Sequence, residues 1–380
     1  IGFKYKRPKI ITSGWIMTIF YILILFIGIQ VLKIHRNPAM MAWYLLSIIF
    51  VSIIIGLIFE KNTFCRYICP VGYLLGLYSR LSFFGWRVND KTICTKCKDK
   101  SCIKKDYQYN LIYKSCGVDI YPGKLDDNTN CILCTSCLKS CNKYNPENIE
   151  GRPNPGFSII GFSNDIYKHK SLSLAEVAFL FVVSGFVISE ILSEWNTTNS
   201  FINIIPDIIK QNIDAQDNLL KGLIESVVIF IFYPMFFWVL PYLFLISSKL
   251  KFSEYLRNYG VAFIPIMAFA HLCKSILKMS SRIPYFQYSF NDPTGIETAK
   301  SILNKVILIN PIPDSMNYIV TLLLTISITI GIYISIKIIR NLNLQLSFNS
   351  NSFKFTYIIP IFYGGLFVAT IIIWRWISLI

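Results

Sequence analysis

The chain has 380 residues, of which 54% are hydrophobic and only 15% are charged, and its formal net charge is +16. So much apolar surface cannot be buried in one water-soluble core, which excludes an ordinary soluble domain. The Lys and Arg residues gather between hydrophobic stretches, where they orient membrane proteins, so nucleic-acid binding is not needed to explain the charge. We therefore predict an integral membrane protein that contacts lipid and binds no nucleic acid.

Seven hydrophobic stretches are long enough to cross a hydrocarbon core of about 30 Å as helices. They cover residues 10–32, 39–59, 173–195, 222–247, 260–279, 317–339 and 356–380. The basic residues Lys4, Lys6, Arg7 and Lys9 place the N-terminal end inside under the positive-inside rule. Because the second stretch returns the chain to that side, residues 60–172 are predicted to be cytoplasmic.

Eight of the eleven cysteines lie between Cys94 and Cys141, which indicates a binding site. The last four follow a C-x2-C-x2-C-x3-C spacing, in which three thiolates hold one [4Fe-4S] cube and the fourth reaches a second cube. The reciprocal ligation of two-cluster ferredoxins then divides the eight into two quartets. The first quartet is Cys94, Cys97, Cys102 and Cys141, and the second quartet is Cys116, Cys131, Cys134 and Cys137.

Zinc is the main alternative metal, because paired C-x2-C motifs also build tetrahedral thiolate sites. Zinc ribbons keep their two pairs apart, however, and do not produce a run of four cysteines such as that from Cys131 to Cys141. A disulfide framework is a weaker alternative, because the predicted cytoplasmic side is reducing. The spacing therefore favours two [4Fe-4S] clusters.

These patterns predict a mostly α-helical membrane protein with about seven transmembrane helices and an inserted, ferredoxin-like α+β domain. Residues 1–85 would form two transmembrane helices and an interfacial segment. Residues 86–160 would form the cytoplasmic two-cluster insert, and residues 161–380 a region of five further transmembrane helices.

Residues 65–70, at the end of the second stretch, read Cys-Arg-Tyr-Ile-Cys-Pro. Together with the cysteine-rich segment that follows, they make residues 40–160 resemble the membrane polyferredoxins of the NapH, NosR and CcoG type. In that family a C-x3-C-P element precedes a cytoplasmic two-cluster domain. The resemblance implies a prokaryotic inner or plasma membrane and quinol-linked electron delivery to other redox subunits or a periplasmic reductase or oxidase. A role in metalloenzyme assembly is also known in the family.

Cys65 and Cys69 would lie one turn apart if this segment is helical and could face a common partner. Thiols at a polar boundary tend to be reactive, which favours a redox-active or metal-binding pair. The alternative is a pair of inert thiols at a helix end that Pro70 closes.

His271, Lys274 and Lys278 recur at helical spacing in the fifth stretch and predict one polar stripe. Charges at membrane depth are costly, so the stripe is a candidate site for a quinone, a haem propionate or another anionic cofactor. The alternative is that the lysines snorkel to the interface while His271 hydrogen-bonds within the bundle. His35 and His169 lie outside clear stretches, so a haem held by two histidines of this chain alone is not expected.

Motifs for nucleotide binding or flavin attachment are not visible in the sequence, which argues against a dedicated substrate site. We predict a non-catalytic electron-transfer protein that relays electrons between a cytoplasmic or quinone-pool partner and a membrane or periplasmic redox enzyme. Two alternatives stay open. One is a maturation factor that supplies electrons for metalloenzyme assembly, and the other is a redox sensor that signals through its helices.

Overall fold

A computed structural model describes residues 3, 5–104, 114–143, 155–159, 161–168, 170–213, 217–245, 250–308, 312–346 and 351–376, with backbone only for 351–353. His169 lies outside these residues. The chain separates into two compact units. The first unit comprises Ile1–Leu180, Lys210–Val227 and Leu256–Val261, and the second comprises Phe181–Ile209, Val228–Tyr255 and Ala262–Ile380.

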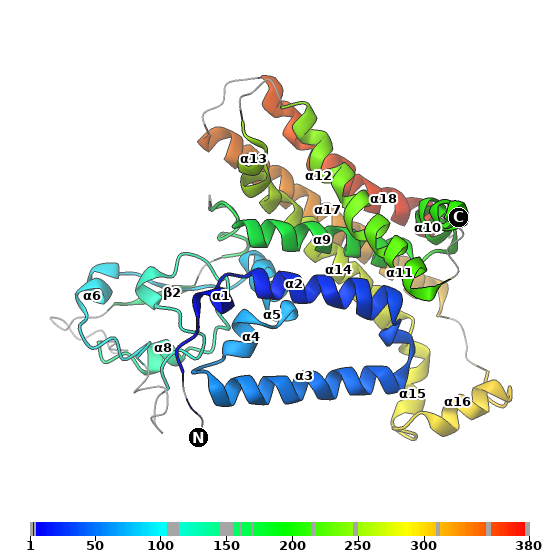
Figure 1. Ribbon diagram of the computed structural model, residues 1–380, viewed down its shortest axis with the longest axis horizontal. Helices are drawn as coiled ribbons and strands as arrows, with labels where there is room; N and C mark the ends of the chain where they lie inside the picture. The colour runs from blue at the N-terminus through cyan, green and yellow to red at the C-terminus, as the bar shows by residue number, and fades with distance from the viewer. Residues whose placement is uncertain are drawn as a thin grey trace. The chain divides into compact units, whose positions relative to one another are not determined.

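Helices dominate both units (Figure 1). Short 3₁₀ or π segments are named η here and are not labelled in the figure. Up to the second strand the elements are α1 (Lys9–Thr12), α2 (Trp15–Leu23), η1 (Ile24–Val31), η2 (Ile34–Arg36), α3 (Pro38–Ile58), α4 (Thr63–Tyr67), α5 (Pro70–Tyr78), η3 (Ser79–Leu81), β1 (Trp86–Val88), α6 (Lys91–Lys96), η4 (Pro122–Lys124), α8 (Ser136–Lys139) and β2 (Phe157–Ile159). The later elements are α9 (Leu174–Leu192), α10 (Asn196–Asn212), α11 (Asn218–Val227), η5 (Val228–Phe232), α12 (Tyr233–Leu243), α13 (Phe252–Tyr259), η7 (Gly260–Ala262), α14 (Phe263–Ser280), η8 (Ile283–Tyr285), α15 (Phe286–Ser289), α16 (Ile296–Leu303), α17 (Asp314–Gln345), η9 (Asn351–Tyr357), η10 (Ile359–Gly364), α18 (Gly365–Ile371) and η11 (Ile372–Trp376).

Six helical segments of the described chain are long and apolar enough to cross a membrane, which is consistent with an integral membrane protein. They are Pro38–Ile58, Leu174–Leu192, Asn218–Leu243, Phe252–Ser289, Asp314–Gln345 and Lys354–Trp376. Each overlaps a stretch predicted from the sequence, although Phe252–Ser289 and Asp314–Gln345 extend well beyond the predicted bounds. The remaining stretch, residues 10–32, contains a shorter apolar helix over Trp15–Val31. It is shorter because Gly14 adopts a φ of +82° and separates this helix from α1.

Helix α3 begins at a well-formed cap and exposes its whole length. The Asn37 side chain accepts hydrogen bonds from the backbone N–H groups of Ala39 and Met40 at 3.1 and 3.3 Å, and Pro38 occupies the first helical position. None of its most apolar window is buried inside the chain. Because a helix satisfies its backbone polar groups internally, such a surface is stable against lipid tails.

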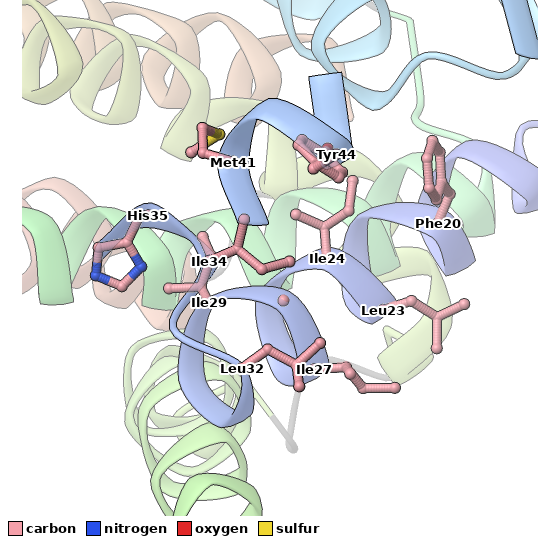
Figure 2. A pocket seen from close by; sticks show the side chains of 11 residues that line it. Phe20, Leu23, Ile24, Ile27, Ile29, Leu32, Ile34, His35, Met41 and Tyr44 are labelled. Atoms are coloured by element: carbon pink, nitrogen blue, oxygen red, sulfur yellow. The ribbon is translucent and has the colours of Figure 1, made fainter. Parts of the chain in front are cut away.

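An apolar cavity of about 380 Å³ lies in the first unit between α3 and the helix formed by α2 and η1 (Figure 2). Met41 and Tyr44 come from the start of α3, and Ile34 and His35 come from η2. Leu32 directly follows η1, and the other lining residues belong to α2 and η1. The lining is hydrocarbon apart from His35 and Tyr44. It is therefore a surface suited to lipid chains.

Aromatic side chains form the centre of the second unit. Trp238 of α12 stacks on Phe263 of α14, with ring centroids 4.3 Å apart and an interplanar angle of 4°. Its indole N–H donates to the Ser184 hydroxyl at 3.0 Å, and the Tyr363 hydroxyl donates to the Ser184 carbonyl oxygen at 3.0 Å. Because a hydrocarbon core offers no water, these internal bonds satisfy polar groups that would otherwise be costly to bury.

The two ends of the cysteine-rich segment meet in a small antiparallel sheet. Strand β1 pairs with β2 so that Trp86 lies opposite Ile159 and Val88 opposite Phe157. The Trp86 and Phe157 rings also stack, with centroids 5.3 Å apart. In the described part of the insert this is the only sheet, and the rest consists of loops and the short helices α6, η4 and α8. A ferredoxin-like fold of the insert, and the three-part division of the chain, remain predictions.

Packing in the second unit predicts that Gly185→Ala is destabilising. A Cβ atom at Gly185 would lie 2.5 Å from the Ile229 carbonyl oxygen and 2.6 Å from Cγ of Pro234. Overpacking of this kind costs about 1–3 kcal/mol, which exceeds the gain in helix propensity. Gly56→Ala is the matched control, because that Cβ would meet nothing within 4 Å. Thermal unfolding in detergent should show a lower midpoint for Gly185→Ala only; equal midpoints for the two variants would contradict this packing.

Candidate metal centre

The four cysteines of the first quartet line one cavity in the insert, although they come from separate segments. Cys94 lies in α6, Cys97 and Cys102 lie in the loop that follows, and Cys141 lies beyond α8. Burial raises the pKa of Cys102 to about 12, and the thiols of Cys141, Cys94 and Cys97 act in the same direction. The four sulfurs are therefore electrostatic neighbours.

Hydrogen bonds from outside the quartet position this cavity. Helix α6 starts after Asp90, whose carboxylate accepts the backbone N–H two residues further on at 2.8 Å. The Tyr121 hydroxyl donates to the Cys94 carbonyl oxygen. The Ser101 hydroxyl donates to the Ser140 carbonyl oxygen at 2.5 Å and so joins the loop after Cys97 to the residue before Cys141. These hydrogen bonds hold α6, the loop after Cys97 and the residue before Cys141 around the cavity of the first quartet.

The second quartet is also grouped. Burial raises the pKa of Cys137 to about 12, with further contributions from the neighbouring thiols of Cys116, Cys131, Cys102 and Cys134. Burial likewise raises the pKa of Cys131, where Cys116 and Cys134 again contribute. Of these thiols Cys134 is exposed, whereas Cys116 is buried. The four cysteines of the second quartet thus lie near one another, and Cys102 of the first quartet is close to them as well. Their ligation of one cluster remains a prediction.

The loops of the second quartet turn backbone N–H groups toward sulfur. The Ile120 N–H donates to Cys116 Sγ at 3.4 Å, and the Leu133 N–H donates to the Cys131 thiol. Leu133 and Thr135 adopt φ angles of +51° and +58° on either side of Cys134. Left-handed backbone at residues other than glycine costs about 1–3 kcal/mol each, so the surrounding fold must impose it. Such turns form concave arrays of N–H groups that favour negative charge.

One backbone hydrogen bond joins the two quartets directly. The Cys116 N–H donates to the Cys102 carbonyl oxygen at 2.7 Å. Cys102 belongs to the first quartet and Cys116 to the second, so the two groups of thiols are adjacent. Electrons could pass between metal groups held at these two places without leaving the insert.

The donor set fits a pair of [4Fe-4S] clusters, with four thiols for each and backbone N–H groups directed at some of the sulfurs. All eleven cysteines are described, and each is a free thiol. Within the described residues, no three His, Cys, Asp or Glu side chains are placed to hold a single metal ion. Because burial opposes ionisation of the thiols, the positive charge of iron would supply what stabilises the thiolates.

A buried ion pair holds the segment that leads into the second quartet. Arg87 of β1 pairs with Asp165, and their side chains are 9% and 4% exposed. Arg87 also donates to the Asn128 side-chain oxygen at 2.9 Å, while Asp165 accepts the Asn128 N–H at 2.9 Å. The Asn128 carbonyl oxygen in turn accepts the Cys131 N–H at 2.8 Å. Sequence reasoning missed this pair, because its members lie 78 positions apart.

Cys65 lies in α4, and Cys69 is the residue that precedes α5. The two helices approach closely, since a Cβ atom at Gly72 would lie 2.2 Å from the Cys65 carbonyl oxygen. Cys65 and Cys131 line one cavity of about 180 Å³, and Cys69 is not among the residues that line it. The structure therefore brings Cys65 next to the second quartet. A redox-active or metal-binding role for the pair remains a prediction.

The polar stripe of α14 has acidic partners at the end of α9. Lys274 Nζ lies 3.1 Å from Glu190 Oε2 and also pairs with Glu194, and Lys278 Nζ lies 3.6 Å from Glu194 Oε1. These carboxylates supply countercharge for both lysines. Glu194 was missed by the sequence reasoning, because it lies in the turn after α9 and meets the lysines only through tertiary packing. A quinone or haem beside His271 remains a prediction.

The buried Arg87–Asp165 pair predicts a large effect of Asp165→Ala. The change leaves the Arg87 guanidinium buried without its carboxylate, which typically costs about 3–5 kcal/mol. Asp126→Ala is the matched control, because its pair with Lys91 has side chains 70% and 51% exposed and contributes at most about 1 kcal/mol. Limited proteolysis of the insert at increasing urea concentration should show earlier cleavage for Asp165→Ala. Equal protection of both variants would mean that the buried pair does not hold the insert.

The comparisons with known proteins cover only part of the chain. A family described as a 4Fe-4S binding domain matches residues 41–89, whose only cysteines are Cys65 and Cys69. An uncharacterised protein of Methanocaldococcus jannaschii is 32% identical over 100 residues, which is 26% of this chain and 34% of that protein. A second uncharacterised protein of the same organism is 33% identical over 85 residues, 22% of this chain and 30% of its own length.

The chain thus spans about a third of the length of these curated relatives. No solved structure matches it. The family match supports an iron–sulfur protein of ferredoxin type that binds a 4Fe-4S cluster, and the six apolar helices fit a membrane protein.

Proposed function

We propose that the chain is a membrane-bound electron-transfer protein in which the two quartets hold two [4Fe-4S] clusters within a ferredoxin-like insert. The observation that carries this proposal is that Cys94, Cys97, Cys102 and Cys141 line one cavity while Cys116, Cys131 and Cys134 all lie near Cys137. This arrangement is compatible with reciprocal ferredoxin ligation. The match of residues 41–89 to a 4Fe-4S binding domain supports the same chemistry.

Each cluster, when bound, supplies a centre that accepts and releases one electron. The chain supplies soft thiolate ligands, N–H donors at Cys116 and Cys131 that stabilise negative charge, and the contact between Cys102 and Cys116 that keeps the two sites adjacent. Cys134 is exposed. Electrons therefore enter or leave most readily at the second quartet, where a redox partner can approach.

The order of a C-x3-C-P element and a double cysteine motif supports placement among the NapH, NosR and CcoG type of membrane polyferredoxin. In that setting the partners are other redox subunits, the quinone pool, or a periplasmic reductase or oxidase. A quinone or haem beside His271 would extend the route, with Lys274 held by its two glutamates.

A second candidate function is maturation of another metalloenzyme. Its support is that Cys65 is exposed and shares a cavity with Cys131. One electron from the second quartet could there reduce a metal ion that a client protein presents, whereas a client disulfide would need two electrons, one from each cluster, and two protons from solvent. Cys65→Ser would abolish that reduction but leave electron transfer to a redox subunit intact, which separates the two functions.

We also propose that Trp15–Val31 crosses the membrane, giving seven crossings. Arg7 Nη2 lies 2.7 Å from Asp119 Oδ2 in the insert, and the Tyr5 N–H donates to the Ile58 carbonyl oxygen at 2.9 Å at the end of α3. Residues before and after this helical hairpin therefore share one side. An even number of crossings must separate them, so α3 can span only if Trp15–Val31 spans too. Its 17 residues are near the lower limit of about 17–25 for a span.

The hairpin topology predicts which lysines a protease reaches. With the basic insert on the cytoplasmic side, trypsin should cut sealed inside-out vesicles after the exposed Lys96, Lys98 and Lys100 but spare Lys33 and Arg36 in the turn. Right-side-out vesicles should show the reverse pattern, and detergent should open both sites. Mass spectrometry maps the cuts. Cleavage of the turn and the insert from the same side would rule out the hairpin, and a reversed pattern would invert the orientation.

Cluster content tests the function directly. Anaerobically purified protein should contain about eight iron and about eight acid-labile sulfide per chain. Cys134→Ser should lower both values by about half, because one cluster loses a thiolate while the other keeps its own four. Cys273→Ser is the control, since that buried thiol belongs to α14 and to neither quartet. Zinc in place of iron, or full iron in Cys134→Ser, would refute the assignment.

A further inference from the structure

Arg66 is a cation whose hydrogen-bonding capacity is largely unused. It lies in α4 directly after Cys65, and its guanidinium carbon is 4.9 Å from the centroid of the Tyr67 ring. Both Nε and Nη1 are buried, and neither has a hydrogen-bond partner among the described residues. Burying unpaired donors on a charged group is costly, so a partner is expected at this place.

Neighbouring cations already occupy Asp119, the carboxylate whose charge acts on Arg66. Asp119 Oδ2 is 2.7 Å from Arg7 Nη2, and Asp119 Oδ1 is 2.6 Å from Lys61 Nζ. These contacts hold the pKa of Asp119 below its usual value despite its partial burial. Arg66 forms no ion pair within 4.0 Å with any described carboxylate. Its charge interacts with Asp119 only at longer range.

Arg66 lies close to the second quartet. Arg66 and Cys131 line the same cavity of about 180 Å³, together with Cys65 and Asn130. Arg66 also interacts electrostatically with Cys116. Two of the four thiols of the second quartet are thus neighbours of a half-buried cation that has unused, buried N–H donors. Four thiolates around one cluster carry the negative charge that would satisfy it.

We propose that Arg66 is a positioning residue for the second quartet, whose positive charge and free N–H groups stabilise the reduced cluster and raise its reduction potential. This inference rests on the proposed function. Reduction adds one electron to the cluster, and no bond forms or breaks at Arg66. The guanidinium keeps its protons in both states, because it stays charged at all accessible pH values. Each added electron therefore strengthens the same charge-assisted hydrogen bonds.

The test is a potentiometric titration of the anaerobically purified full chain, followed by electron paramagnetic resonance. Arg66→Gln should lower one of the two midpoint potentials, with a fall of about tenfold in the equilibrium constant for reduction, or about 59 mV for one electron. Arg66→Lys keeps the positive charge but loses the paired donors of the guanidinium. The midpoint potential of the second cluster in this variant should therefore lie between those of the wild type and Arg66→Gln. Lys100→Gln, at the cavity of the first quartet, is the matched control and should leave that same potential unchanged.

The outcomes separate this inference from the function on which it rests. Full iron content with both potentials unchanged in Arg66→Gln would overturn the role of Arg66 and leave the two-cluster function standing. Wild-type protein without two clusters would instead overturn the function. If Arg66→Gln cannot hold the second cluster, the midpoint potential of the second cluster in Arg66→Lys tests the inference. A lowered potential in Arg66→Lys supports the inference. A wild-type potential together with full iron content in that variant overturns the inference.

Discussion

The cost of burying thiolates is the constraint on which the insert depends. Burial raises the pKa of Cys94, Cys102, Cys131 and Cys137, so these side chains favour the neutral thiol without a positive partner. In our proposal iron supplies that partner, which would couple folding of the insert to cluster binding. At the second quartet, backbone N–H groups directed at sulfur lower the free-energy cost of burying thiolates. In our proposal Arg66 lowers this cost further. The same interactions that make the thiols acceptable ligands therefore also set the potential.

A segment with so few regular elements needs anchors outside its cysteines. The pairing of β1 with β2 closes the insert, and the buried pair of Arg87 and Asp165 fixes the start of the run that leads to Cys131. On the membrane side, Lys61 and Arg7 converge on Asp119 and attach both ends of the N-terminal hairpin to the insert. These contacts determine where the clusters would lie relative to α3. They also place Cys65 beside the second quartet.

Local patterns were enough to predict six of the long helices from the apolar stretches. The division of eight cysteines into two quartets, made by analogy with two-cluster ferredoxins, remains a prediction. The sequence reasoning overestimated the length of the helix at residues 10–32, because hydropathy does not detect the positive φ of Gly14 that breaks the helix. Ion pairs and hydrogen-bond partners that lie far apart in the sequence could not be predicted from it. Glu194 opposite Lys274, Asp165 opposite Arg87 and the unpaired donors of Arg66 all depend on tertiary packing.

The central claim is that two adjacent clusters share this insert, and the spectrum of the reduced protein tests it most directly. The hydrogen bond between Cys116 and Cys102 places the quartets side by side, so two reduced paramagnetic clusters should interact. Electron paramagnetic resonance of the fully reduced chain should show two spins per molecule with broadening from spin–spin coupling, replaced by one uncoupled signal in Cys134→Ser. A single uncoupled signal in the wild-type protein, or none at all beside stoichiometric zinc, would contradict the account.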